Sequence, residues 1–338
     1  MAPDDALLAR LGCDLKRIAF GRHHDPHSVL GAHEFNGRMF ALVHLPGART
    51  VRLGRGLDAP RIQNGDFFAW SGTADDLNAP YRVSWTDAQG TVNEHVDPYC
   101  FGSSIDPLDL TAFAAGEHRA VWRFLGAHEL ASAGFAGVRF AVWAPNAERV
   151  SVVGPFCRWD GRRFPMRALG TSGVWEIFIP GLARGELYKF EIRNRDPGVI
   201  FLKSDPCARL AERRPATASI IAAPTAQEWR NAEWLERRGR FDWLHQPVSI
   251  YEVHLASWRR QPDGGFLNYR ELARELVPYA KRLGFTHLEL LPIAEHPLDD
   301  SWGYQSTGHF APTSRHGSPE DLRAFIDACH GVPSFSVQ

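Results

Sequence analysis

The amino-acid sequence predicts a multidomain protein in which two tandem antiparallel β-sandwich modules precede a parallel β/α segment. Two observations support this fold class. The first part of the chain contains an internal duplication of short alternating strands, and after residue 247 the pattern changes to strand, helix, strand, helix. A chain of 338 residues is long enough for two or three domains with a large apolar core.

The duplication is visible in the repeated pentapeptide LGAHE, which occurs at residues 30–34 and again at 125–129. Further pairs follow in the same order: YRVSW (81–85) is matched by YKFEI (188–192), and HVDPYC (95–100) by KSDPCA (203–208). Between them, FFAW (67–70) is matched by VWEI (174–177), and six single residues recur: Gly37, Phe40, Ala41, Pro46, Ala48 and Val51 as Gly137, Phe140, Ala141, Pro145, Ala147 and Val150. Conserved order over this length predicts two copies of one module.

Each copy is predicted to be an antiparallel, immunoglobulin-like β-sandwich, because its short strands are separated by Gly, Pro and Asn turns. Successive side chains of a strand point to opposite faces, so Phe140 and Val142 point one way and Trp143 the other. Trp143, together with Trp159 in the turn-rich CRWDG, is a candidate to stack on a sugar ring. The alternative is that both tryptophans only cover the sandwich edges.

The composition disfavours several kinds of partner. Lys+Arg 38 against Asp+Glu 39, without a long run of one sign, argues against nucleic acid, and 11 Trp with 21 Phe suit an uncharged ligand. Five cysteines without metal-ligand spacing indicate reduced thiols and no metal site: Cys13, Cys100, Cys157, Cys207 and Cys329. The sequence shows no signal peptide and no apolar run approaching the roughly 20 residues that span a bilayer. We therefore expect a soluble, cytoplasmic protein that does not bind a membrane.

Residues 209–247 are polar and rich in Pro, and they are predicted to be a linker. After them, VSIYEVHL (248–255) and FTHLELLPI (285–293) are predicted to be strands. A helix is predicted at 269–284, with Asn268 as its N-cap and the buried stripe Leu272, Leu276, Val277 and Leu283. A second helix is predicted to begin at Ser318, with one apolar face made of Leu322, Phe325, Ile326 and Cys329.

Apolar strands that alternate with helices form a parallel sheet with right-handed crossovers. The stretch EHPLDDSWGYQ (295–305) follows the second strand, so it is predicted to lie on a loop at the carboxyl end of the sheet. A parallel β/α barrel has its active site at that end.

Several long motifs resemble one known family, in that family's order. GVRFAVWAPNAERVSVVGPFCRWDGRRFPM resembles the starch- and glycogen-binding module of branching and debranching enzymes, and HHDPHSVLGAHE resembles the extra amino-terminal module of many bacterial branching enzymes. YEVHLASWRR and SWGYQ resemble the first barrel strand and a barrel loop of the same proteins. The resemblance to the 1,4-α-glucan (glycogen) branching enzymes of the α-amylase superfamily extends to about Gly331.

This resemblance implies three domains. Residues 1–115 are expected to form the amino-terminal β-sandwich, residues 116–225 the glycogen-binding β-sandwich, and residues 226–338 the start of a (β/α)8 barrel truncated early. The second sandwich departs from the family at one turn, where Pro155 and Cys157 stand in place of Asp and Asn. Pro155 removes a backbone donor there.

The resemblance also implies a retaining transfer reaction, in which one carboxylate forms a glycosyl-enzyme and a second serves as acid and base. In the superfamily these groups follow later barrel strands, so we expect no catalytic residue in this chain and no activity of the chain alone. Glu295, Asp299 and Asp300 are the rival acids, and we expect them to be solvated surface groups rather than catalysts. Residues from about 245 onward are expected to be poorly stable, because few parallel strands leave open edges.

The implied partner is an α-glucan such as glycogen or amylose, with no cofactor. In relatives, the residue matching Tyr304 packs against glucose, and Trp302 and Gln305 flank it; with Trp143 and Trp159 these are the expected substrate-binding residues. The alternatives are a non-catalytic glucan-binding protein, or a debranching or trehalose-releasing relative. The duplicated first module and Gln305 argue against the last two.

Overall fold

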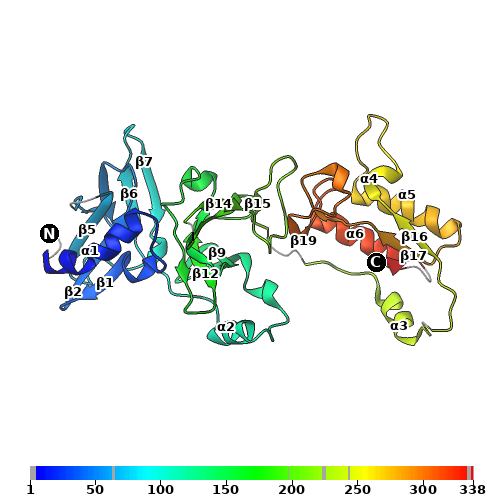
Figure 1. The fold of residues 1–338 in the computed structure, drawn as a ribbon, viewed down its shortest axis with the longest axis horizontal. Coiled ribbons are helices and arrows are strands. Elements are labelled where there is room, and N and C mark those ends of the chain that lie inside the picture. Colours follow the sequence, from blue (N-terminus) through cyan, green and yellow to red (C-terminus); the bar gives the residue numbers. More distant parts are fainter. Residues whose placement is uncertain are drawn as a thin grey trace. The chain divides into compact units, whose positions relative to one another are not determined.

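The structure is a computed structural model that describes residues 5–62, 65–196, 198–222, 226–242, 244–332 and 336–337 (Figure 1). It divides into two compact units, Met1–Asp205 and Pro206–Gln338. The first unit holds both β-rich modules, and the second holds the mixed β/α segment. The predicted succession of sandwich-like modules and a β/α segment is therefore present.

In the first module, two antiparallel sheets enclose an apolar core. One sheet has the order β1-β2-β5: β1 (Gly31–Phe35), β2 (Arg38–His44) and β5 (Phe67–Gly72). The other has the order β4-β3-β6-β7: β4 (Leu57–Asp58), β3 (Thr50–Leu53), β6 (Arg82–Thr86) and β7 (Val92–Val96). Val43, Val51, Phe68, Val83 and Trp85 are among the buried residues between the sheets.

A helix that sequence analysis did not identify covers the outer face of this module. Helix α1 (Asp5–Ala19) packs Leu7, Leu15 and Ile18 against Phe40 and Phe67 of the β1-β2-β5 sheet. The short 3-10 helix η1 (Pro26–Ser28) leads from α1 into β1. As a result, both faces of this sheet are buried.

The second module repeats the same two-sheet arrangement. One sheet has the order β11-β12-β9-β8: β11 (Arg167–Ala168), β12 (Val174–Pro180), β9 (Phe135–Trp143) and β8 (Gly126–Ser132). The other joins β10 (Ala147–Val153), β13 (Leu187–Asn194) and β14 (Ile200–Lys203) in that order. Between the modules lie η2 (Pro98–Cys100), α2 (Pro107–Ala114) and η3 (Val121–Arg123), and η4 (Pro155–Cys157) follows β10.

The two modules share internal contacts as well as strand order, which confirms the duplication. His33 Nε2 lies 2.9 Å from the carbonyl oxygen of Leu30, and His128 Nε2 lies 2.8 Å from that of Leu125. A buried tyrosine hydroxyl also donates to a buried aspartate in both copies: Tyr81 to Asp97 at 2.7 Å, and Tyr188 to Asp205 at 2.5 Å. Equivalent residues therefore make equivalent bonds.

Part of the sequence alignment between the copies was wrong by one residue. Gly31 pairs with Leu42 in the first hairpin, whereas the equivalent Gly126 pairs with Ala141. The β8–β9 hairpin is longer on each strand, and this extra length shifts the correspondence. The true equivalents of Phe140 and Trp143 are Ala41 and His44, and the proposed pairs Gly37/Gly137, Phe40/Phe140 and Ala41/Ala141 do not hold.

The second unit contains a parallel sheet with the order β16-β17-β20: β16 (Ile250–Val253), β17 (His287–Leu290) and β20 (Ser336–Val337). Its other strands are β15 (Ser219–Ile220) and the antiparallel pair β18 (Ala294–Glu295) and β19 (Gly308–Pro312). Two parallel strands were predicted. The third, β20, lies in a stretch that sequence analysis left without structure.

The helices of this unit are α3 (Ala232–Arg240), α4 (Leu255–Trp258), α5 (Tyr269–Arg282) and α6 (Pro319–His330), with the 3-10 helix η5 (Asp299–Ser301). Both predicted caps are confirmed, since Asn268 and Ser318 each accept a hydrogen bond from the third residue of the helix. One predicted core residue is wrong, because Leu283 follows the end of α5 and is 53% exposed. Among the described residues, no helix is both long and apolar enough to cross a membrane.

The predicted linker contains helix α3 and packs against its own unit. Trp234 of α3 stacks on His330 of α6, with ring centroids 3.8 Å apart. The backbone N–H of Arg230 donates to Asp327 at 2.8 Å. Sequence analysis missed this helix because its 9 residues are too few for the apolar pair Trp234 and Leu235 to recur as a periodic pattern.

Candidate functional site

The loop of residues 295–305 lies beyond the carboxyl end of β17, as predicted. Its conformation depends on two residues in the left-handed region. Trp302 ends η5 at φ 55°, and Gly303 follows at φ 91°. A Cβ on Gly303 would overlap the carbonyl oxygen of Pro292, so only glycine fits at this position.

Arg315, which sequence analysis did not single out, holds this loop together. Its side chain is only 2% exposed, and it donates to Asp299 Oδ1 at 2.5 Å, to Glu295 Oε1 at 3.2 Å and to the carbonyl oxygen of His296 at 2.7 Å. This role could not be predicted from the sequence, because strand β19 separates Arg315 from its partners along the chain. An arginine with several donors in a fixed plane is well suited to join two carboxylates.

Two of the three acids, Glu295 and Asp299, make structural bonds, and Asp300 is exposed as expected. Glu295 is buried and accepts the backbone N–H of Ser314 at 2.7 Å, so the expectation that it is a solvated surface group was wrong. Hydrogen bonds from Arg214 and Arg315 hold the pKa of Asp299 well below its usual range. A general acid needs a raised pKa, and Asp299 has the opposite shift.

The three predicted sugar contacts of this loop are exposed, but only Trp302 lines the neighbouring cavity. Trp302 is 56% exposed and stacks on His254 with ring centroids 5.6 Å apart. The two rings, with Asp299 and Arg315, line a cavity of about 220 Å³. Tyr304 and Gln305 are exposed and are not among the residues that line this cavity.

His254 and His296 serve different purposes beside this cavity. Burial, with the neighbouring charges of His296 and Arg260, lowers the pKa of His254, so its ring is neutral near pH 7. Its Nδ1 lies 2.9 Å from the hydroxyl of Ser257. His296 is buried and its Nδ1 lies 2.9 Å from the carbonyl oxygen of Ala294, so this residue braces the loop.

In the second module, Trp143 lies at the end of β9 and is 54% exposed, on the face that alternation predicted. Phe113 of α2 contacts it edge-on, with ring centroids 6.0 Å apart. Its equivalent in the first module, His44, is buried and stacks on Phe67 at 4.6 Å. The same strand position is therefore closed in one copy and open in the other.

Trp159 lies in the turn after η4 and is 39% exposed. Arg158 and Trp159 both have positive φ, and the backbone N–H of Trp159 donates to Gly154 at 2.9 Å. Cys157 bonds both the N–H and the carbonyl of Gly154 through its sulfur at 3.4 Å, and Pro155 occupies the first position of η4. The turn thus retains side-chain hydrogen bonding despite its unusual residues.

The five predicted residues therefore fall into separate places. Trp302, Tyr304 and Gln305 share one loop of the second unit, Trp143 ends a strand of one sheet of the second module, and Trp159 follows a strand of the other sheet. In the described part of the chain, no group of three or more His, Cys, Asp or Glu side chains is arranged to hold a metal ion.

Family comparisons assign a class to both modules. The family model of carbohydrate-binding module 48 (isoamylase N-terminal domain) matches residues 124–208. The model of the N-terminal domain of alpha-1,4-glucan branching enzyme GlgB matches residues 12–99. The first unit thus consists of modules found in enzymes that act on α-glucans.

The sequence relatives narrow this class to one family. Proteins named 1,4-alpha-glucan branching enzyme GlgB are 52% identical in Methylococcus capsulatus (97% of this chain, 44% of the relative) and 51% identical in Cellvibrio japonicus (95% and 45%). The protein of the same name from Nitrosococcus oceani is 51% identical over 94% of this chain and 42% of its own length. Over nearly its whole length the chain is similar to the amino-terminal part of GlgB branching enzymes, and it spans less than half the length of these relatives.

Proposed function

We propose that this polypeptide is the glucan-binding part of a 1,4-α-glucan branching enzyme of glycogen biosynthesis. Such an enzyme transfers an α-1,4-linked glucan segment to a 6-hydroxyl group and so creates an α-1,6 branch. The observation that carries the proposal is the order of the matched modules, in which a GlgB N-terminal domain precedes a carbohydrate-binding module. In addition, about half of the residues are identical to those of branching enzymes over nearly the whole chain.

The second part of the proposal concerns the β/α segment. We propose that residues 226–338 form the start of a (β/α)8 barrel, after modules at 1–115 and 116–225. The parallel order of β16, β17 and β20, with α5 between the first two and α6 before the third, supports this interpretation. The two family matches fall inside the first two ranges.

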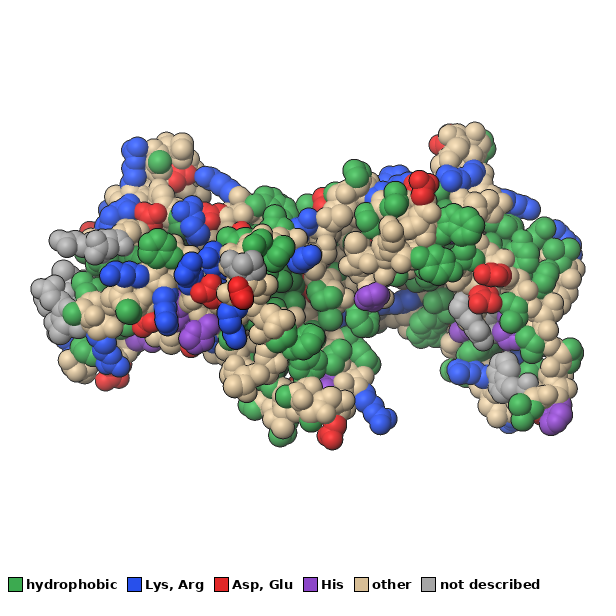
Figure 2. All heavy atoms as spheres, in the orientation of Figure 1, with side chains coloured by type: hydrophobic (Ala, Val, Ile, Leu, Met, Phe, Trp, Pro, Cys, Tyr) green, Lys and Arg blue, Asp and Glu red, His purple; other side chains and the backbone are tan. Residues whose placement is uncertain are grey.

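The third part of the proposal concerns the residues that contact glucan, and it is based on the exposure of their side chains and their positions in the fold. We propose that Trp143 and Trp159 stack on the sugar rings of an α-glucan, and that Trp302, Tyr304 and Gln305 contact glucan at the carboxyl end of the sheet. All five are exposed. An uncharged ligand is further supported by Figure 2, where basic and acidic side chains are interspersed over the first module rather than gathered by sign.

Catalysis by residues 1–338 alone is not part of the proposal. Arg315 bonds both Glu295 and Asp299, and the pKa of Asp299 is lowered, so these carboxylates are poorly suited to act as acid and nucleophile. The same observation favours a second candidate, a non-catalytic glucan-binding protein. A cytoplasmic location is also proposed, supported by five free cysteines.

Retardation in native gels that contain glycogen, combined with an iodine-absorbance branching assay on amylose, tests these proposals. The 338-residue polypeptide should be retarded, Trp143→Ala and Trp159→Ala should each be retarded less, and the control Trp229→Ala, 44% exposed and outside both modules, should behave as the parent. Absence of retardation of the parent polypeptide would refute glucan binding. New α-1,6 linkages in amylose, with host activity excluded, would show that residues 1–338 are catalytic after all.

A further inference from the structure

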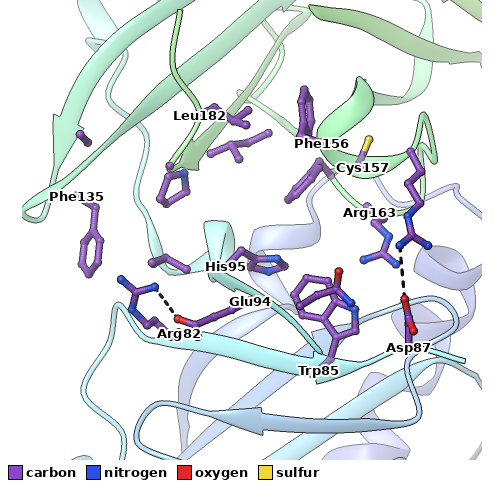
Figure 3. Close-up of a pocket in the computed structure, with 18 residues that line it drawn as sticks. Arg82, Trp85, Asp87, Glu94, His95, Phe135, Phe156, Cys157, Arg163 and Leu182 are labelled. Atoms are coloured by element: carbon purple, nitrogen blue, oxygen red, sulfur yellow. Dashed lines mark hydrogen bonds and ion pairs between the residues drawn. The ribbon is translucent and has the colours of Figure 1, made fainter. Parts of the chain in front are cut away.

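A cavity of about 480 Å³ lies between the two duplicated modules of the first unit (Figure 3). Strands β6 and β7 of the first module form one side of it. The other side comes from the second module: the start of β9, the turn at η4, and residues 179–182 at the end of β12 and just after it. Its volume falls within the range of about 300–1,000 Å³ that is usual for small-ligand sites.

Aromatic and aliphatic side chains supply part of the wall. Phe135, Phe156 and Leu182 are half-buried and flank the cavity in Figure 3. Trp85 forms part of the opposite side, and the Arg163 guanidinium lies 5.5 Å from the centre of its ring. Flat apolar surfaces of this kind suit a ring-shaped ligand.

The charged groups of the wall largely neutralise one another. Arg82 donates to Glu94 at 2.6 Å, and Arg158 lies 3.5 Å from Asp87. Arg163 makes no ion pair with an acid in the described part of the chain, and donates to a backbone carbonyl at 3.2 Å. With three guanidinium groups against two carboxylates the wall carries little net charge, and both kinds of group can bond neutral hydroxyl groups.

Two further polar groups on the wall have unused hydrogen-bonding capacity. Burial, together with the nearby charge of Arg163, lowers the pKa of His95 to about 4, so its ring is neutral at pH 7 and offers one donor and one acceptor. Within the described ranges, neither ring nitrogen of His95 nor the indole N–H of Trp85 has a hydrogen-bond partner, although the two rings touch at 4.9 Å. Polar groups in such surroundings gain from a ligand that pairs with them.

We propose that this cavity binds the end of an α-glucan chain, a short run of glucosyl units, held between the two modules. Arg163, His95 and Trp85 bond its hydroxyl groups, and Phe135 and Phe156 face its rings. The identity of the ligand rests on the proposed function, while the cavity and its unpaired groups do not. Neither Trp143 nor Trp159 lines the cavity, although Trp159 directly follows the lining residue Arg158.

The proposal gives the first module a direct role in binding. Helix α1 closes the outer face of its β1-β2-β5 sheet, so that face cannot hold a sugar chain. Strands β6 and β7 belong to the other sheet, and they present Trp85 and His95 to the second module. A ligand seated there touches both copies and stabilises their association by binding only the folded pair.

Hydrogen exchange of the full 338-residue polypeptide, with maltoheptaose as the probe, tests the proposal at the cavity itself. Peptides that cover β6–β7 and residues 179–182 should gain protection together as maltoheptaose is added. Arg163→Gln should raise the concentration for half-maximal protection at least about tenfold. Leu182→Trp should abolish the protection by filling the space. The control is Arg162→Gln, since the adjacent Arg162 is exposed and outside the cavity, and it should behave as the parent.

The outcomes separate this site from the proposed function. Protection confined to peptides around Trp143 and Trp159, or protection of β6–β7 that survives both Arg163→Gln and Leu182→Trp, would overturn the cavity site and leave glucan binding intact. No protection anywhere by maltoheptaose would sink both. A parallel titration with inorganic phosphate that protects β6–β7 in an Arg163-dependent way, when maltoheptaose does not, would overturn the glucan assignment and identify an anion site.

Discussion

Replacing Tyr81 by Phe should destabilise the first module, and the loss should depend on pH. The Tyr81 hydroxyl donates to Asp97 at 2.7 Å, and both groups are buried. Burial raises the pKa of Asp97 to about 6, and the bond from Tyr81 partly opposes that shift. Tyr81→Phe therefore removes a donor from a buried carboxylate and should raise the pKa of Asp97 further.

The size of the effect follows from the charge on Asp97. Above pH 7 the carboxylate is ionised, so the lost hydrogen bond should cost about 1.5–3 kcal/mol of unfolding free energy. At pH 5 Asp97 is mostly protonated in the folded state, and the cost should fall to about 1 kcal/mol, as for a neutral pair. The difference between parent and variant should therefore grow as pH rises through about 6.

In the parent protein, different groups contribute to the pH dependence of stability with opposite signs. Asp97 has a folded pKa above its unfolded value of 3.8, so its contribution to stability decreases by roughly 3 kcal/mol in total as pH rises from well below 4 to well above 6. His44 and His95 have folded pKa values of about 4, below their unfolded 6.5, and their contribution is lost as pH falls through that window. The histidines are common to parent and variant, so the difference between them isolates Asp97.

Hydrogen exchange in peptides of β6 and β7, corrected for the intrinsic rate at each pH, measures this difference locally. Tyr99→Phe is the matched control, because the Tyr99 hydroxyl donates to the carbonyl oxygen of Pro165 at 3.2 Å and its loss should not depend on pH. The reasoning is refuted if Tyr81→Phe costs the same at pH 5 and pH 7.5, or if Tyr99→Phe shows the same pH dependence.

Three further predictions concern the second unit. Arg315→Met leaves the buried Glu295 without its ion pair, so the free energy of opening β18 and β19, measured by amide exchange, should fall by about 3–5 kcal/mol. The control Arg270→Met removes an exposed ion pair and should cost at most about 1 kcal/mol. Gly303→Ala should displace the loop turn and expose it to chymotrypsin, and unchanged cleavage would contradict the close packing seen there. In limited proteolysis the chain should be cut after residue 245 before the modules are, since β16 has a strand on only one side among the described residues; equal resistance would count against this.

Much of the fold could be predicted from local sequence, because local rules dictate it. Alternation placed Trp143 on the exposed face, and the cap residues Asn268 and Ser318 located the starts of α5 and α6. The repeated LGAHE revealed the duplication. Each of these features depends on residues that are neighbours in the chain or lie at a fixed spacing.

The features that were missed depend on contacts far apart in the chain. Arg315 reaches back across β19 to Glu295, and no spacing rule connects the two. The longer second hairpin displaced the alignment of β2 with β9, which only strand register reveals. Helix α1 is an exception, because Leu7, Leu15 and Ile18 lie on one helical face and give it a local signal that was overlooked.

The two copies show how one sandwich can serve two purposes. Phe40 of the first module packs with α1 and His44 stacks on Phe67, and the equivalent strand positions of the second module hold Arg139 and Trp143. Arg139 is buried and bonds the carbonyl oxygens of Arg123 and Phe124 at 3.2 Å, so this face is closed by polar contacts near its centre and left open at Trp143.

A helix that covers a whole apolar face stabilises a module but removes that face as a binding surface. The second module differs, because the buried Arg139 stabilises this face while the exposed Trp143 leaves one end of it accessible to a ligand. This difference in exposure is the reason that Trp143, and not the buried His44, is the proposed glucan contact. Replacing Trp143 by His, the residue of the closed copy, should therefore weaken glycogen retardation without lowering the stability of the second module. A loss of stability instead would show that Trp143 serves packing rather than binding.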